Sequence, residues 1–114
     1  MQVEREIVVE APRSEVWSAL TEPERLEEWF ANDVVLDARP GGAGHFRWSN
    51  GEERHAVVET AEPEECLRLR WDDDGAVELR LEDVAGGTRV SVRETSPEWS
   101  TALAVRALAA CAIA

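Results

Sequence analysis

The segment Ser96–Ala114 constrains the fold more than any other part of the chain. It opens with a serine suited to an N-cap, a proline suited to the first helical position, and the acid Glu98, which together are typical of a helix start. The residues that follow are rich in alanine and leucine, lack glycine and proline, and include one charge, Arg106. A helix that is apolar on nearly every side has to be covered. Because its apolar run is shorter than the roughly 18 residues of a membrane span, we expect a long helix gripped by the rest of the chain.

Most of the remaining chain alternates between apolar and charged residues, which predicts strands with one buried face. The first strand is expected at 3–10, and Asn50-Gly51 is the strongest two-residue hairpin signal. Short connections make consecutive strands antiparallel, and a sheet with one apolar face needs a cover on that side. The six later strands are expected at 33–39, 45–49, 54–60, 67–71, 77–82 and 89–93.

Two short helices are predicted between the first and second strands, at 13–20 and from Thr21 onward. Thr21 followed by Glu24 is typical of a capping box at the start of the second helix. Helices this short are not stable alone and have to pack on something. Their apolar residues are Val16, Ala19 and Leu20 in the first helix, and Leu26, Trp29 and Phe30 in the second. The predicted class is therefore α+β, in the order β-α-α-β-β-β-β-β-β-α, with the sheet wrapped around the C-terminal helix.

Composition limits the classes of function. The chain of 114 residues is large enough for one core, so we expect a single domain over 1–114. The 24 acidic residues outnumber the 12 arginines, giving a net charge of −12, which argues against binding to nucleic acid or to an anionic membrane. Cys66 and Cys111 match no metal-ligand spacing. The N-terminus shows no signal-peptide pattern, so we expect reduced thiols and a cytoplasmic location.

Several motifs occur in an order that points to a known family. They are Ala11-Pro12-x-x-x-Val16-Trp17-x-Ala19-Leu20-Thr21-x-Pro23-x-x-Leu26-x-x-Trp29-Phe30, Asp37-x-Arg39-Pro40-Gly41-Gly42 with Phe46, Glu62-Pro63-x-x-x-Leu67-x-x-x-Trp71, and Gly87-Thr88-Arg89-Val90. In this order the chain resembles the START-like, helix-grip superfamily (SRPBCC), and within it the AHSA-like branch named after the activator of the Hsp90 ATPase. Members of that branch are usually longer, so we expect either a shortened last helix or a helix end that packs against a partner chain.

The resemblance implies a cavity between the sheet and the long helix. The inward faces of the predicted elements supply a wall for it, although plain core packing is the usual role of such residues. The candidate wall residues are Trp29, Phe30, Phe46, Trp48, Val58, Leu69, Trp71, Leu79, Val92, Trp99 and Leu103. We expect a small hydrophobic or aromatic molecule as the partner, with no cofactor and no metal.

Polar candidates are few. By alternation, His45 and His55 lie opposite the apolar face and are expected in solvent. Arg54 and Glu94 are the polar groups that could orient a ligand or act as acid and base in the cavity, together with Thr60 and Arg106. The alternative, which we favour for Arg54 and Glu94, is that charges at strand ends stay in water. No catalytic motif is present, so no catalytic residue is assigned.

Three functions follow from these observations. The first is non-catalytic binding of a small hydrophobic or aromatic ligand between the sheet and the C-terminal helix. The second is an enzyme similar to the polyketide cyclases and aromatases of the superfamily, which requires a titratable group inside the cavity. The third is a protein-interaction module, with a chaperone or a second copy of the chain as partner, marked by an exposed apolar patch near the end of the long helix.

Overall fold

The computed structural model describes residues 3–72 and 75–95. The predicted C-terminal helix, with Trp99, Leu103 and Arg106, lies outside the described residues. In chain order the described elements are β1 (Val3–Val9), α1 (Arg13–Thr21), α2 (Pro23–Trp29), β2 (Asp33–Leu36), β3 (Ala43–Arg47), β4 (Glu53–Glu62), β5 (Cys66–Trp71), β6 (Ala76–Val84) and β7 (Gly87–Glu94). Neither described helix is long and apolar enough to cross a bilayer.

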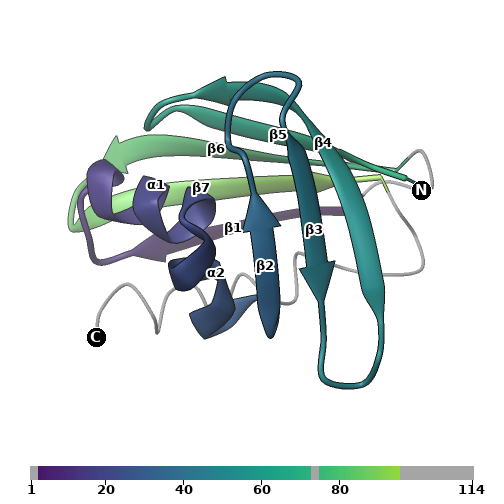
Figure 1. Cartoon of the computed structure of the whole chain (residues 1–114). Coiled ribbons are helices and arrows are strands. Elements are labelled where there is room, and N and C mark those ends of the chain that lie inside the picture. Colours follow the sequence, from purple (N-terminus) through teal and green to yellow (C-terminus); the bar gives the residue numbers. More distant parts are fainter. Residues whose placement is uncertain (1–2, 73–74, 96–114) are drawn as a thin grey trace.

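The seven strands form one curved antiparallel sheet in the order β1-β7-β6-β5-β4-β3-β2 (Figure 1). Consecutive strands pair as hairpins from β2 to β7, and β1 returns to pair with β7 along its whole length, from Val3 opposite Glu94 to Val9 opposite Thr88. The α+β class and the antiparallel curved sheet are thus confirmed for the described residues.

Both helices pack on one side of the sheet, which we call the inner face; the opposite side is the outer face. α1 contacts β6, β7 and α2, while α2 contacts β2, so the pair covers one end of the inner face (Figure 1). The inner face is apolar because alternate strand residues point to the same side. Its buried members include Val58, Leu69, Leu79, Val90 and Val92.

A bulge in β4 changes which of its residues face inward. The register shifts between Val58 and Thr60, so Thr60 lies opposite Arg68 on the outer face, and Ala61 packs against the core. The prediction that Thr60 points inward was therefore wrong, because strict alternation does not survive an extra residue in one strand. The bulge also bends the sheet, which helps it to curve around the inner face.

The start of α2 also differs from the prediction. Thr21 is the last residue of α1, and its hydroxyl donates to the carbonyl of Trp17 at 2.8 Å. Glu22 takes the N-cap position and Pro23 begins the helix. Thr21 cannot cap α2 because α1 runs on to within one residue of it, and its hydroxyl bonds back into its own helix instead.

Two connections hold the inner face in place. The β3–β4 turn is a three-residue loop, because Trp48 donates to Glu52 at 2.9 Å and Gly51 has a φ of 93°, so the predicted two-residue turn was wrong by one residue. At the other end, the fully buried hydroxyl of Thr88 donates to the carbonyl of Ala11 at 2.8 Å. This bond ties β7 to the residue just before α1 and fixes where the helices meet the sheet.

Candidate functional site

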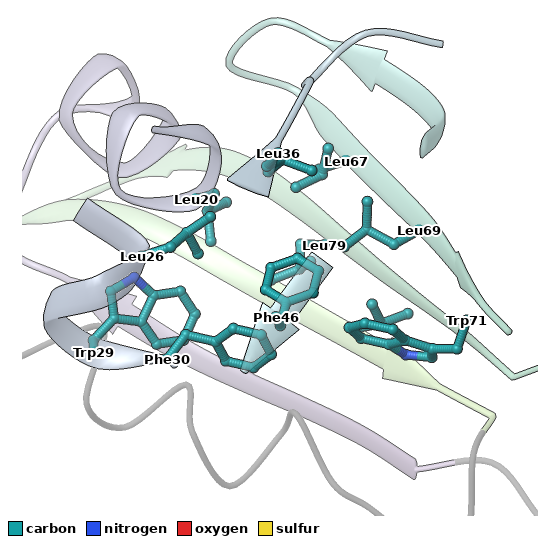
Figure 2. Close-up of a pocket in the computed structure, with 11 residues that line it drawn as sticks. Leu20, Leu26, Trp29, Phe30, Leu36, Phe46, Leu67, Leu69, Trp71 and Leu79 are labelled. Atoms are coloured by element: carbon teal, nitrogen blue, oxygen red, sulfur yellow. The ribbon is translucent and has the colours of Figure 1, made fainter. Parts of the chain in front are cut away.

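A hollow lies on the inner face, between the two helices and strands β2, β3, β5 and β6 (Figure 2). All of the side chains around it are leucine, valine, phenylalanine or tryptophan. They are Leu20, Leu26, Trp29, Phe30, Leu36, Phe46, Leu67, Leu69, Trp71, Val77 and Leu79. The cavity volume is about 20 Å³, which is room for one water-sized molecule. Such a lining offers dispersion contacts and no hydrogen bonds to whatever enters it.

The predicted wall residues fall into three groups. Trp29, Phe30, Phe46, Leu69, Trp71 and Leu79 line the hollow. Val58, Val92 and Trp48 belong to the surrounding core and do not line it. Trp99 and Leu103 lie outside the described residues. Whether the lining residues bind a ligand stays a prediction.

The wall contains five further residues that the prediction left out. They are Leu20, Leu26, Leu36, Leu67 and Val77. Alternation had already placed Leu36, Leu67 and Val77 on the apolar faces of their strands, and helical spacing had done so for Leu20 and Leu26. The signal was therefore present, but sequence alone does not separate the residues around a hollow from the rest of the core.

An aromatic cluster forms one side of the hollow. The ring of Phe30 lies at its centre, with ring centroids 5.3 Å from Trp29, 5.4 Å from Phe46 and 5.4 Å from Trp48. The contacts with Phe46 and Trp48 are edge-to-face, at 85° and 74°, an arrangement that contributes about 0.5–1.5 kcal/mol per pair beyond area burial. Phe46 continues the cluster to Trp71, with centroids 5.6 Å apart.

Two of the tryptophans are held by hydrogen bonds to backbone carbonyls. The indole N–H of Trp29 donates to Ala19 at 2.9 Å, and that of Trp48 donates to Phe30 at 2.6 Å. The first bond joins α2 to α1, and the second joins the end of β3 to the end of α2. Because each ring is fixed by a polar contact as well as by packing, its orientation is set.

Two charged residues, which do not line the hollow themselves, lie next to residues that do. Glu94 is fully buried at the end of β7 and lies opposite Val77, which lines the hollow. The guanidinium carbon of Arg54 lies 4.7 Å from the ring centroid of Trp71, a cation–π contact. The expectation that Glu94 stays in water was wrong. It is buried because it follows the inward alternation of Val90 and Val92 along β7, and because its register partners Val3 and Val77 flank it on the neighbouring strands.

The two histidines lie on the outer face, as alternation predicts, and the structure brings them together. His45 and His55 are register partners on β3 and β4, and their rings stack with centroids 4.3 Å apart. Glu53 Oε1 lies 3.5 Å from His45 Nε2, and Asp72 Oδ2 lies 3.8 Å from His55 Nδ1. In residues 3–72 and 75–95, no group of three or more histidine, cysteine, aspartate or glutamate side chains is arranged to hold a metal ion.

Arginine–glutamate pairs cover much of the rest of the outer face. Glu59 accepts hydrogen bonds from the Nε atoms of Arg70 and Arg68, each at 2.9 Å, and these two arginines hold the pKa of Glu59 below its ordinary value. Arg93 Nε lies 3.1 Å from Glu4 Oε1. These pairs couple neighbouring strands and keep the outer face in water, so the hollow of the inner face is the better candidate site.

Comparison with known proteins supports the fold. The chain is 18% identical to protein MLL2253 from Mesorhizobium loti, with a TM-score of 0.83 over 98% of this chain and 93% of that one. It is 19% identical to the Aha1 protein of Colwellia psychrerythraea, solved in solution as a dimer, with a TM-score of 0.78 over 99% of this chain and 89% of that one.

A third similar structure is DynU16, a protein of the dynemicin biosynthetic locus. The identity is 24% and the TM-score is 0.82, over 96% of this chain and 46% of DynU16. At these identities the three structures establish a shared fold and nothing finer. A comparison with curated protein sequences gave no significant match.

A family profile agrees with the structures. The profile described as "Activator of Hsp90 ATPase homolog 1-like protein" matches residues 10–110, which is most of the chain. The match includes both helices and the strands that surround the hollow. The chain therefore belongs to the activator of Hsp90 ATPase homolog 1-like family.

Proposed function

We propose that the hollow of the inner face binds a small hydrophobic or aromatic molecule. One observation carries this proposal: the described lining is wholly apolar and brings four aromatic rings, those of Trp29, Phe30, Phe46 and Trp71, to one cavity. Ligand pockets are typically lined in this way, with a few polar groups at the margin. Arg54 and Glu94 are such marginal groups, and the family resemblance is consistent with a carrier.

In this proposal the C-terminal segment completes the site. The resemblance to helix-grip proteins implies that Ser96–Ala114 forms a helix over the inner face, with Trp99 and Leu103 toward the ligand. A cover of this kind would keep water from the apolar lining, where a bound apolar molecule gains most.

Tryptophan fluorescence tests the proposal, because Trp29 and Trp71 both line the hollow. The chain is titrated with a panel of single-ring and fused-ring aromatics, fatty acids and polyketide-like compounds. We expect at least one class to change the emission saturably. If no compound does so, the proposal is wrong.

A matched pair of variants tests whether the ligand binds in the hollow. Leu79→Phe adds a ring inside the hollow, where Leu79 is 4% exposed, and Val35→Phe adds a ring to the outer face, where Val35 is 68% exposed. We expect Leu79→Phe to weaken binding by at least about tenfold, because the hollow has no space to spare. Val35→Phe should bind like the unmodified chain. Equal binding by both variants would place the ligand elsewhere.

A catalytic role is the second candidate, and the burial of Glu94 favours it. A carboxyl group enclosed on the inner face beside Val77 is the titratable group that a cyclase-like reaction needs. Under this alternative, Glu94→Gln and Arg54→Ala abolish turnover of a polyketide-like substrate while the fold is retained, as judged by circular dichroism. Unchanged turnover in both variants would remove it.

A further inference from the structure

The size of the cavity sets a condition on any ligand. An apolar cavity of about 150 Å³ takes up benzene, whereas the hollow holds about 20 Å³. An aromatic ring that is to lie among the lining side chains, rather than over the open side of the hollow, therefore enters only if one of those side chains moves away. The class of ligand therefore depends on which lining side chain moves. This inference rests on the proposed function.

The lining aromatics differ in how firmly they are held. Trp29 is tied to the carbonyl of Ala19, and the sheet residues Phe46 and Trp71 are each 1% exposed in the middle of the core. Moving any of these breaks a hydrogen bond or opens the centre of the core. Phe30 is different: it is half-buried, has no polar atom in its side chain, and follows α2 directly as its C-cap residue.

The surroundings of Phe30 already form an aromatic cage. The rings of Trp29, Phe46 and Trp48 surround it with centroid distances of 5.3–5.4 Å. Hydrogen bonds fix both tryptophans of the cage, and the one from Trp48 ends on the carbonyl of Phe30 itself, which holds the backbone at the base of the Phe30 side chain. The cage is therefore preorganised for an aromatic ring of the size of Phe30.

We propose that the ligand of the hollow is a neutral molecule with a one- or two-ring aromatic group, and that one ring of this group takes the place of the Phe30 ring. The edge-to-face contacts that Phe30 makes are then made by the ligand. A charge on the ring is disfavoured because the residues that line the hollow are all apolar, and the marginal groups Arg54 and Glu94 are not among them. Phe30 thereby selects for aromatic shape, since only a flat ring replaces its contacts.

The chain allows a direct test because it contains two phenylalanines, Phe30 and Phe46. The full chain is labelled with 4-fluorophenylalanine, its two ¹⁹F resonances are assigned with Phe30→Leu, and indole, naphthalene, cyclohexane and benzoate are titrated. The solvent isotope shift between H₂O and D₂O reports how far each fluorine is exposed. We expect indole and naphthalene to bind, the Phe30 signal to gain solvent exposure at saturation, and the Phe46 signal to stay buried.

Phe30→Ala gives a second measurement. If the ring has to leave before the ligand enters, the apparent affinity is reduced by the small fraction of open molecules. Removing the ring then strengthens indole binding by about ten- to a thousandfold, for an open state populated at roughly 0.1–10%. Phe30→Trp keeps the cage filled and should bind more weakly than the unmodified chain.

Each outcome decides something. Saturable binding of indole with no change in the exposure of Phe30, or with no gain in Phe30→Ala, overturns the role of Phe30 and leaves ligand binding in place. Preference for cyclohexane or benzoate over indole overturns the ligand class. If no compound of either panel binds to the unmodified chain or to Phe30→Ala, both this inference and the proposed function are wrong.

Discussion

The two faces of the sheet are built from the same strands, but the inner face is packed with apolar side chains and the outer face carries charged side chains. On the inner face, Phe46, Leu69 and Leu79 pack around a hollow with no polar group in its described lining. On the outer face, Glu59 bonds to Arg68 and Arg70 in contact with water. Alternation along each strand separates the two faces, so stability comes mainly from one side and solubility from the other. A substitution on the inner face should therefore lower the free energy of unfolding far more than the same kind of substitution on the outer face.

The largest expected effect comes from removing a ring at the centre of the inner face. Phe46 is 1% exposed and contacts Phe30, Trp48 and Trp71 through its ring. Phe46→Ala should lower the free energy of unfolding by about 3–5 kcal/mol, measured by urea denaturation. The matched control, Val35→Ala on the outer face, should stay within about 0.5 kcal/mol. Similar losses in both variants would mean that the two faces are not distinct.

The next effect concerns Thr88, a buried polar residue among the apolar ones of the inner face. Thr88→Val keeps the shape of the side chain and removes the hydrogen bond to the carbonyl of Ala11, which should lower the free energy of unfolding by about 1–3 kcal/mol. Thr88→Ser retains the hydroxyl and should lose less. A Thr88→Val protein as stable as the unmodified chain would show that this link between β7 and α1 does not matter.

The third effect concerns Cys66, a buried residue on the otherwise water-exposed outer face. Its register partner Arg80 is exposed, while Cys66 itself is buried. Burial, with a smaller effect from Glu78, raises the pKa of the Cys66 thiol, so little reactive thiolate forms at pH 8. In a Cys111→Ser background, labelling by a thiol reagent should be slow in buffer and fast in urea. Fast labelling of the folded chain would contradict this placement.

The smallest effect is expected at Glu59. Its pKa lies below the ordinary value of 4.5, so its pairing with Arg70 and Arg68 stabilises the folded chain above that pH. This contribution is lost as the pH falls through the lowered pKa. Glu59→Gln should therefore have a slightly lower free energy of unfolding than the unmodified chain at pH 7. This gap in free energy should close below pH 4.5 and in high salt. A gap that is constant with pH would point to packing rather than charge.

The same contrast explains what sequence could predict. The alternation of charged and apolar residues located each of the seven described strands and, apart from the bulge in β4, separated the two faces, because a burial pattern with a period of two is a local property of the sequence. It could not reveal the bulge that turns Thr60 outward, since no glycine or proline marks the extra residue. Nor could it reveal the burial of Glu94, which depends on the inner-face side chains that surround it in the folded chain.

The hollow shows the same limit. Leu67 and Val77 were placed on apolar faces by their spacing, yet their position at a cavity depends on how α1 and α2 sit on the sheet. The small volume of that cavity depends on the rotamers of the side chains that line it, which no pattern in the sequence encodes. Local patterns thus predict which face is buried, and tertiary packing decides where that face remains hollow.

Native mass spectrometry of the full chain, purified gently from its own host, tests the central claim most directly. We predict a species heavier than the bare chain by the mass of one small apolar molecule, which is released on unfolding and is absent from Leu79→Phe but present in Val35→Phe. A bare mass for the unmodified chain, together with no binding of any aromatic compound added afterwards, would contradict the account.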